Sequence, residues 1–462
     1  MTREDWSAEL SALAVRHGVP GAVLGVIDIG ADQAADRCRV AAHGVINTGT
    51  GQPVLPETVF QIGSITKPYT ATLMAQAIDE GRTALDQPVI EILGPGVALT
   101  ADPVASSMIT IGHLLTHRSG IDGDLFADTG RGDDCLERYV ELLARSTQMF
   151  RPGSRYSYSN AAWVVAGRVL EILYGRPWRL VLRDKIIEPL GLTHTSTLAE
   201  EAILHSAAVG HTGGPGEPRH PVDHWTLPRS IGPAGLINST AAELLAVAAE
   251  HARDGGRLLS PAAAASMRAD YGANPPGLQI EGHQGLGWMV GRWQGHEVFG
   301  HNGLTVGQSA YVIVVPSLRV AVCLLTNGPG AANLWFELRR EVLADRGLTV
   351  PPSTLEPTGT EADLAPWLGR YGRVGERIEL VRSETGYRAL IEEDIDLGDE
   401  PETQELELHP VRDGLWAGRS AGQLSWTQFR VGTFTDAELP PTSPPADRRY
   451  LYAGSRINHV LS

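Results

Sequence analysis

Lysine is nearly absent from this chain of 462 residues: of its 38 basic side chains only Lys67 and Lys185 are lysines, and the others are arginines. Arginine stays protonated in proteins, whereas a lysine amine can be tuned to lose its proton and act as a base. A chain that uses arginine almost everywhere therefore draws attention to the two positions where it does not.

Cysteine and long apolar runs are also scarce. The three cysteines, Cys38, Cys135 and Cys323, show no metal-ligand spacing and are interpreted as reduced, buried thiols, so no metal or cofactor is expected. No run approaches the ~20 apolar residues that span a bilayer, and the first residues do not resemble a secretory signal. With a net charge of −16, nucleic acid would be repelled. We expect a cytoplasmic protein without a membrane or nucleic-acid partner.

Hydrophobic residues make up 42% of the chain, enough for a sizeable core. Strand-like patterns occur near both ends of the first 350 residues, and helical patterns dominate between 65 and 280. Strands are predicted at 21–27, 38–46, 286–290, 297–300, 309–315 and 320–326, and helices at 4–17 and 333–344. Strands at both ends with helices between them predict one sheet assembled from distant segments and flanked by helices.

The last hundred residues differ in character. A Pro/Thr-rich segment at 347–362 is typical of a linker. After it, residues 363–462 alternate short apolar runs with Gly and acidic turns, which favours a small antiparallel β-domain or barrel. The sequence thus predicts two domains, 1–346 and 363–462.

The segment Phe60–Lys67 contains Ser64-Ile65-Thr66-Lys67, the one Ser-x-x-Lys in the chain. Positions three apart share a helix face, so the Ser64 hydroxyl and the Lys67 amine can meet. A serine hydroxyl is a poor nucleophile until a base takes its proton, and a partly buried amine at a helix N-terminus is such a base. Chance alone produces such a match in roughly one chain in ten of this composition.

Two further segments carry polar groups suited to a reaction site. Tyr158-Ser159-Asn160 precedes a helical run; a phenol can transfer a proton and an amide can bind a lysine or a carbonyl, although such a segment is more often a loop with a helix cap. His301-Asn302-Gly303 lies between strand patterns, where glycine permits close approach of a substrate to an edge strand. The backbone N–H of Leu304, with that of Ser64, would form an oxyanion hole.

In this order the motifs resemble those of the serine β-lactamase and penicillin-binding-protein superfamily, whose members carry Ser-x-x-Lys, Tyr-x-Asn and Lys/His-x-Gly. The matching pairs are Ser64 and Lys67, Tyr158 and Asn160, and His301 and Gly303. Segments similar to those of the family also occur at 111–121, 189–192 and 233–240, so the resemblance covers about residues 5–345. It implies a catalytic α/β (α+β) domain with an antiparallel sheet flanked by helices and an all-helical region. It also implies catalytic roles for Ser64, Lys67, Tyr158 and His301.

The resemblance further implies substrate contacts for Asn160, Gly303, Leu304 and Gly235, the last within 233–240. His113 and His117, in the segment 111–121, are interpreted as structural. The third motif has histidine in place of lysine, the form seen in esterases, D-amino-acid-specific peptidases and related acyltransferases. A largely neutral imidazole binds a carboxylate less well than a permanent cation.

Several activities fit this resemblance. We favour the penicillin-binding-protein-type thioesterases, which release and cyclise a nonribosomal peptide with a D-configured C-terminal residue and carry a lipocalin-like C-terminal domain. That branch implies a peptide-like substrate and a phosphopantetheinyl carrier protein as partner. The alternatives are a cytosolic D-stereospecific peptidase or esterase, and a catalytically silent binding protein on the same scaffold.

Two arginines near the end of the chain complete the candidate site. Arg448 and Arg449 follow a Pro-rich loop, and the simpler interpretation is a solvated basic pair entering a terminal strand. The sharper hypothesis is that one of them binds a carbonyl or carboxylate of the substrate.

Overall fold

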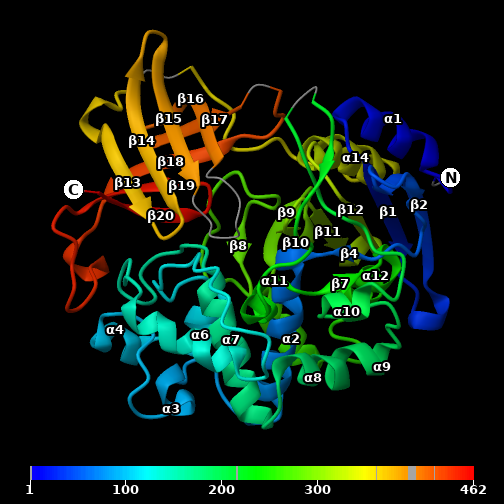
Figure 1. Ribbon diagram of the computed structural model, residues 1–462, viewed down its shortest axis with the longest axis horizontal. Helices are drawn as coiled ribbons and strands as arrows, with labels where there is room; N and C mark the ends of the chain where they lie inside the picture. The colour runs from blue at the N-terminus through cyan, green and yellow to red at the C-terminus, as the bar shows by residue number, and fades with distance from the viewer. Residues whose placement is uncertain (1–2, 215–216, 360–361, 394–401, 421, 462) are drawn as a thin grey trace. The chain divides into compact units, whose positions relative to one another are not determined.

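A computed structural model of the protein describes residues 3–214, 217–359, 362–393, 402–420 and 422–461 (Figure 1). The chain falls into two compact units, each built from segments that are far apart in sequence. The first unit comprises Met1–Arg82, Tyr174–Gly272 and Gly282–Pro351, and the second comprises Thr83–Leu173, Ala273–Glu281 and Pro352–Ser462.

The first unit contains the large sheet and most of the helices. Its helices are α1 (Ser7–His17), α2 (Thr66–Asp79), α8 (Trp178–Leu182), α9 (Glu188–Leu190), α10 (Ala199–Ala202), α11 (Gly232–Gly235), α12 (Ala241–Ala252), α13 (Pro261–Arg268) and α14 (Ala331–Asp345). Its strands are β1 (Gly21–Asp28), β2 (Arg37–Asn47), β3 (Gln52–Pro53), β4 (Phe60–Gln61), β5 (His211–Thr212), β6 (His220–Pro221), β7 (Asn238–Ser239), β8 (His283–Gln284), β9 (Met289–Trp293), β10 (His296–Leu304), β11 (Ser309–Val315) and β12 (Val320–Thr326). Short 3₁₀ turns are η1 (Gln33–Ala35), η2 (Gly63–Ile65), η5 (Arg229–Ile231) and η6 (Pro316–Leu318), and η4 (Arg183–Ile187) is a π-helical turn.

An antiparallel sheet in the order β3-β2-β1-β12-β11-β10-β9-β8 forms the centre of this unit. Strand β1 pairs with β12 from Ala22 opposite Thr326 to Asp28 opposite Val320. Segments from the two ends of the unit therefore lie side by side in the sheet, which confirms the predicted assembly from distant strands.

Helices cover both faces of the sheet in the first unit. On one face, Trp335 of α14 stacks on Tyr311 of β11 at 5.3 Å between ring centroids, and α1 packs beside α14. On the other face, Cys323 Sγ lies 3.6 Å from the Ala241 carbonyl oxygen of α12. These are opposite faces because Cys323 pairs with the neighbour of Tyr311, and successive side chains alternate. Covering from both sides explains why β11 and β12 are buried along their whole length and apolar except for Ser309 and Thr326.

One cysteine departs from the expectation of buried thiols. Cys135 and Cys323 are buried, but Cys38 is exposed. Cys38 lies at the start of β2, whereas β3 covers that strand only at Val45–Asn47. Among the described residues no strand pairs with the outer side of the N-terminal half of β2, so this half is an edge of the sheet, and the prediction of a buried Cys38 was wrong.

The second unit combines the helical region with the C-terminal strands. Its helices are α3 (Val89–Leu93), α4 (Pro103–Met108), α5 (Ile111–Leu115), α6 (Cys135–Leu142) and α7 (Asn160–Tyr174), whose last residue begins the next segment of the first unit. Its 3₁₀ turns are η3 (Leu143–Arg145), η7 (Ala365–Trp367) and η8 (Asp436–Glu438). Its strands are β13 (Gly369–Arg373), β14 (Glu376–Ser383), β15 (Gly386–Glu393), β16 (Glu402–Arg412), β17 (Leu415–Arg419), β18 (Thr427–Thr433), β19 (Arg449–Ala453) and β20 (Arg456–Val460).

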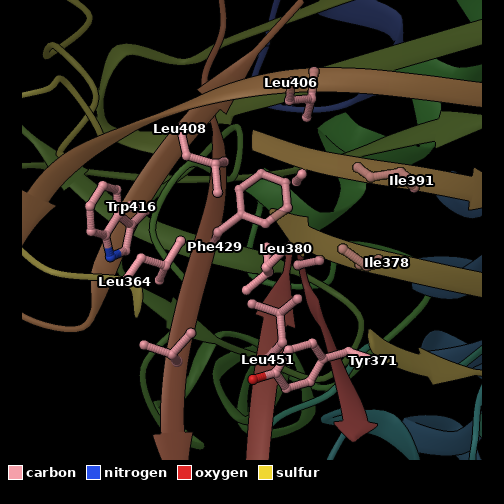
Figure 2. Close-up of a cluster of buried hydrophobic side chains, with 13 residues drawn as sticks. Leu364, Tyr371, Ile378, Leu380, Ile391, Leu406, Leu408, Trp416, Phe429 and Leu451 are labelled. Carbon is pink, nitrogen blue, oxygen red and sulfur yellow. The ribbon is translucent and has the colours of Figure 1, made fainter. Parts of the chain in front are cut away.

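Strands β13 to β20 pair with their neighbours in chain order, and β20 pairs back to β13, so they close into an antiparallel barrel. Figure 2 shows its apolar interior, where Phe429, Leu380 and Leu451 point toward one another from different strands. Side chains alternate between inward and outward positions along each strand, and the inward ones fill the interior of the barrel. The closed barrel, together with the sheet and helices of the first unit, confirms the predicted fold class.

The barrel and the helical region of the second unit share a core. Met149 and Phe150 form one buried cluster with barrel-side residues. Those partners are Phe434, Leu439, Tyr450, Tyr452 and Ile457. Backbone bonds add to it: Arg151 N donates to the Glu438 carbonyl oxygen at 2.8 Å. The barrel is thus packed against the helical region within this unit.

Across the described ranges, no helix is long and apolar enough to cross a membrane.

Candidate active site

Ser64 lies in the tight turn η2, immediately before α2, and its side chain is partly exposed. The preceding residue, Gly63, has φ 51°, a left-handed conformation that favours glycine. A Cβ atom at Gly63 would lie 2.7 Å from the Leu304 carbonyl oxygen. Glycine therefore lets the turn bring Ser64 against the end of β10.

Backbone bonds on both sides hold the serine turn in place. Ile62 N donates to the Ile237 carbonyl oxygen at 2.9 Å, and Ile237 N donates to Thr66 Oγ1 at 3.1 Å. Ile237 lies between α11 and β7, within the family-like segment 233–240. That segment acts as a brace for the turn and for the start of α2.

Lys67, one residue into α2, is fully buried at 0% exposure. Its Nζ atom lies 2.8 Å from Ser64 Oγ and 2.8 Å from the Ala234 carbonyl oxygen. A buried amine needs such oxygen partners to offset its lost hydration. The i, i+3 spacing thus brings the two groups within hydrogen-bond reach, the geometry required of a nucleophile and its base.

His301 on β10 is also buried, with 3% exposure. Burial, together with the charge of Lys67, lowers the pKa of His301 to about 3, against the opposing effect of a bond to Asn302. Its Nδ1 lies 2.6 Å from the Asn302 carbonyl oxygen. Because a carbonyl only accepts, Nδ1 carries the proton of the neutral ring and Nε2 carries the lone pair. His301 therefore does not offer a permanent cation to a substrate carboxylate.

Gly303 lies where β10 touches the serine turn. A Cβ atom there would lie 1.9 Å from the Ile62 carbonyl oxygen and 2.8 Å from Ser64 N. The backbones that carry the Ser64 and Leu304 amides are therefore in direct contact, as an oxyanion hole built from these two N–H groups requires. The Leu304 side chain is 63% exposed beside this contact.

The structure changes one detail of the third motif. The sequence predicted a strand ending at Gly300, but β10 continues through His301 and Gly303 to Leu304. Among the described residues, β9 pairs with β10 as far as Gly300, and the motif residues continue to pair with β11. The motif is therefore part of an inner strand, and Ile62 and Ser64 approach it closely.

The alanine substitution at Gly303 tests this close approach. We expect the added methyl group of Gly303→Ala to displace the serine turn, because the backbone atoms that it would meet cannot move easily. The rate of Ser64 acylation should fall at least about ten-fold, and the fold should lose about 1–3 kcal/mol of stability. Gly49→Ala is the control: Gly49 is exposed between β2 and β3, and a Cβ there would meet the end of the Asn47 side chain at 3.1 Å and Pro221 Cγ at 3.9 Å rather than backbone atoms. Covalent labelling rates and thermal unfolding of the two variants provide the measurement, and equal behaviour would contradict the steric argument.

Tyr158 and Asn160 belong to the second unit. Ser159 between them caps α7, since its Oγ accepts from Ala162 N at 3.1 Å, so the segment is a helix cap as well as a candidate motif. Asn160 Nδ2 donates to Asp124 Oδ1 at 2.8 Å. The Tyr158 ring is partly exposed and stacks on His117 at 4.1 Å between centroids. Their roles in catalysis stay predictions.

Arg448 and Arg449 are engaged in local ion pairs. Arg448 pairs with Asp436 at 2.6 Å, and Arg449 pairs with Asp447 at 2.7 Å. Arg449 also donates to the Pro366 carbonyl oxygen at 3.2 Å. A substrate contact from either arginine stays a prediction.

The sequence did not predict three groups that contact the candidate site residues: the Ala234 carbonyl, Asp124 and Arg456. The Ala234 carbonyl oxygen binds Lys67, and a backbone acceptor leaves no signal in residue type. Asp124 binds Asn160, and Arg456 of β20 binds Asp124 and lies over the Tyr158 ring. Arg456 is far from the motifs in sequence, and only the fold reveals its neighbours.

Among the residues that the structure describes, no group of three His, Cys, Asp or Glu side chains is arranged to hold a metal ion.

Comparison with known proteins defines the class. The family model described as Beta-lactamase matches residues 6–344, and the chain belongs to this family, whose members are serine hydrolases or acyltransferases.

Penicillin-binding protein 4 of Amycolatopsis lactamdurans is 40% identical over 379 residues, which cover 80% of this chain and 97% of that protein. The crystal structure of SurE aligns over 98% of both chains with 26% identity and a TM-score of 0.72, a coverage that includes the barrel. A D-stereospecific amidohydrolase from Streptomyces sp. has 27% identity and a TM-score of 0.57, over 72% of this chain and 98% of that chain.

Proposed function

We propose that the protein transfers a peptide-like acyl group from a thioester, ester or amide to Ser64 and releases it as a macrocycle. The observation that carries the acyl transfer is the position of the buried Lys67 amine, 2.8 Å from Ser64 Oγ. As Oγ attacks the carbonyl carbon, the amine takes the Ser64 proton, and the Ser64 and Leu304 amides bind the oxyanion.

The leaving group then departs with the electron pair of the broken bond and gains a proton, which the motif assigns to Tyr158. The net result is acyl-Ser64 and a protonated leaving group, so protons balance. An amine at the other end of the peptide attacks this ester, loses its proton to a base, and returns the Ser64 hydroxyl. Water attacking instead would give the linear acid.

Three features favour a peptide-like substrate with a D-configured residue at the reacting carbonyl. A neutral His301 suits an ester, thioester or amide better than a substrate anchored by a free carboxylate. The amidohydrolase that shares 27% identity is D-stereospecific. SurE, which aligns over 98% of this chain, also has a crystal structure with D-Leu. A phosphopantetheinyl carrier protein would present such a thioester.

Hydrolysis is the second candidate. It is favoured by the same amidohydrolase, a relative that aligns over less of this chain. Water is far more concentrated than any tethered amine, so cyclisation requires the amine to be held close and water excluded. A D-stereospecific peptidase or esterase would use the same residues up to acyl-Ser64.

Product analysis separates these candidates. We expect a synthetic peptidyl thioester with a D-residue at its C-terminus to give mainly the cyclic peptide, while its L-epimer stays largely unreacted. The measurement is the ratio of cyclic to linear product by mass spectrometry. Linear acid as the main product would favour the hydrolase, and failure of a fluorophosphonate to label the wild-type protein would favour the silent binding protein.

A further inference from the structure

Asp124 joins the Tyr-x-Asn motif to the barrel within the second unit. This buried carboxylate accepts from Asn160 Nδ2 at 2.8 Å. Two barrel arginines bind it as well: Arg456 Nε at 2.6 Å and Nη2 at 3.1 Å, and Arg373 Nη1 at 2.7 Å. Burial alone would raise the pKa of Asp124, but the two arginines and Asn160 outweigh it and hold that pKa below its ordinary value. The carboxylate therefore stays charged and keeps all three partners.

The turn between β19 and β20 and the start of β20 also form hydrogen bonds with the Tyr-x-Asn motif and the residue before it. Tyr158 N donates to the Ser455 carbonyl oxygen at 2.9 Å. Ile457 N donates to Ser157 Oγ at 3.1 Å. Residues on both sides of Arg456 are thereby bonded to Tyr158 and to its neighbour, so Arg456 has a fixed register against the motif.

The Arg456 guanidinium makes a second contact, with the ring of Tyr158. Its central carbon lies 4.8 Å from the centre of the Tyr158 ring, a cation–π distance. The same side chain thus forms an ion pair with Asp124, to which Nη2 donates a hydrogen bond, and contacts the Tyr158 ring through its face. A cation held there also favours the negative charge that develops on the phenol as it gives up a proton.

We propose that Arg456 is a positioning residue, which, with Asp124, holds Tyr158 and Asn160 in the geometry for proton transfer to the leaving group. This inference rests on the proposed function, in which Tyr158 supplies that proton. It also gives the barrel a part in the chemical step. Leaving groups that are stable as anions need no proton, so only substrates with poor leaving groups should respond to a loss of Arg456.

The test compares a p-nitrophenyl ester with an ethyl ester of the same N-acyl-D-amino acid. For Arg456→Gln we expect kcat with the ethyl ester to fall about ten-fold or more, while kcat with the p-nitrophenyl ester stays within about three-fold and KM changes little. Arg456→Lys, which keeps the charge but not the fork, should recover part of the loss. Arg377→Gln is the matched control, because Arg377 is also a barrel arginine and has an exposed ion pair with Glu392.

Fluorophosphonate labelling needs no protonated leaving group and reports whether the folded Ser64 site survives each substitution. If Arg456→Gln does not fold, the same comparison is made with Arg456→Lys, for which a smaller selective loss is expected. Equal losses with both esters, or no loss with the ethyl ester, would overturn the proposal.

A double-mutant cycle separates this inference from the proposed function. If Arg456 acts through Tyr158, adding Arg456→Gln to Tyr158→Phe should cause no further loss with the ethyl ester. Additive losses would overturn the positioning role. A Tyr158→Phe variant with full ethyl-ester activity would instead remove Tyr158 from the mechanism, and the proposal about Arg456 with it.

Discussion

Ser64→Ala is expected to fold normally and to form no covalent adduct with a fluorophosphonate or an acyl substrate. Only one oxygen atom is lost, from a partly exposed side chain in a turn whose backbone bonds involve its neighbours. Without that oxygen there is no nucleophile for the carbonyl carbon, so turnover should fall to the background rate.

Intact-protein mass spectrometry measures the adduct, and thermal unfolding measures the fold. Ser107→Ala is a suitable control, because Ser107 is an exposed serine at the end of α4 and should leave labelling unchanged. An adduct of undiminished yield on Ser64→Ala would exclude Ser64 as the nucleophile.

Lys67→Arg is expected to lower the acylation rate by at least about 100-fold, although it preserves positive charge. A guanidinium does not release its proton at working pH, and the longer side chain must fit a fully buried position between Ser64 and Ala234. Lys67→Met, similar in size and uncharged, tests the same requirement where Arg cannot be accommodated, and should also be inactive.

The chain supplies its own control, because its second lysine lies elsewhere. Lys185 forms an exposed ion pair with Glu80 at 2.7 Å, which arginine can replace. Lys185→Arg should therefore retain full activity. Near-normal acylation by Lys67→Arg would show that the site needs only positive charge at this position.

The sequence predicted the elements of the first unit well because their signals are local. Apolar runs at 309–315 and 320–326 became β11 and β12 with the same bounds, and the Ser-x-x-Lys spacing brought Ser64 and Lys67 together. These outcomes depend on strand propensity and on helical periodicity, both of which can be read within a few residues.

The parts that could not be predicted depend on long-range packing. Nothing near Asp124 in the sequence indicates that Arg373 and Arg456 will bind it. The extension of β10 past Gly300 depends on its pairing with β11, and the exposure of Cys38 depends on the shortness of β3. Backbone groups such as the Ala234 carbonyl carry no residue-type signal at all.

The shared core of the second unit sets the order in which the chain can fold during synthesis. His459 Nε2 lies 2.7 Å from the Met149 carbonyl oxygen, across a sequence separation of 310 residues, and Thr442 N bonds to Asp102 across 340. At the usual speed of translation, the helical region waits roughly 15–60 s for the strands that cover Met149 and Phe150. Until the ribosome releases those strands, the exposed side chains of Met149 and Phe150 form a binding site for chaperones. A chain truncated before β19 should therefore aggregate rather than fold into a shorter active enzyme.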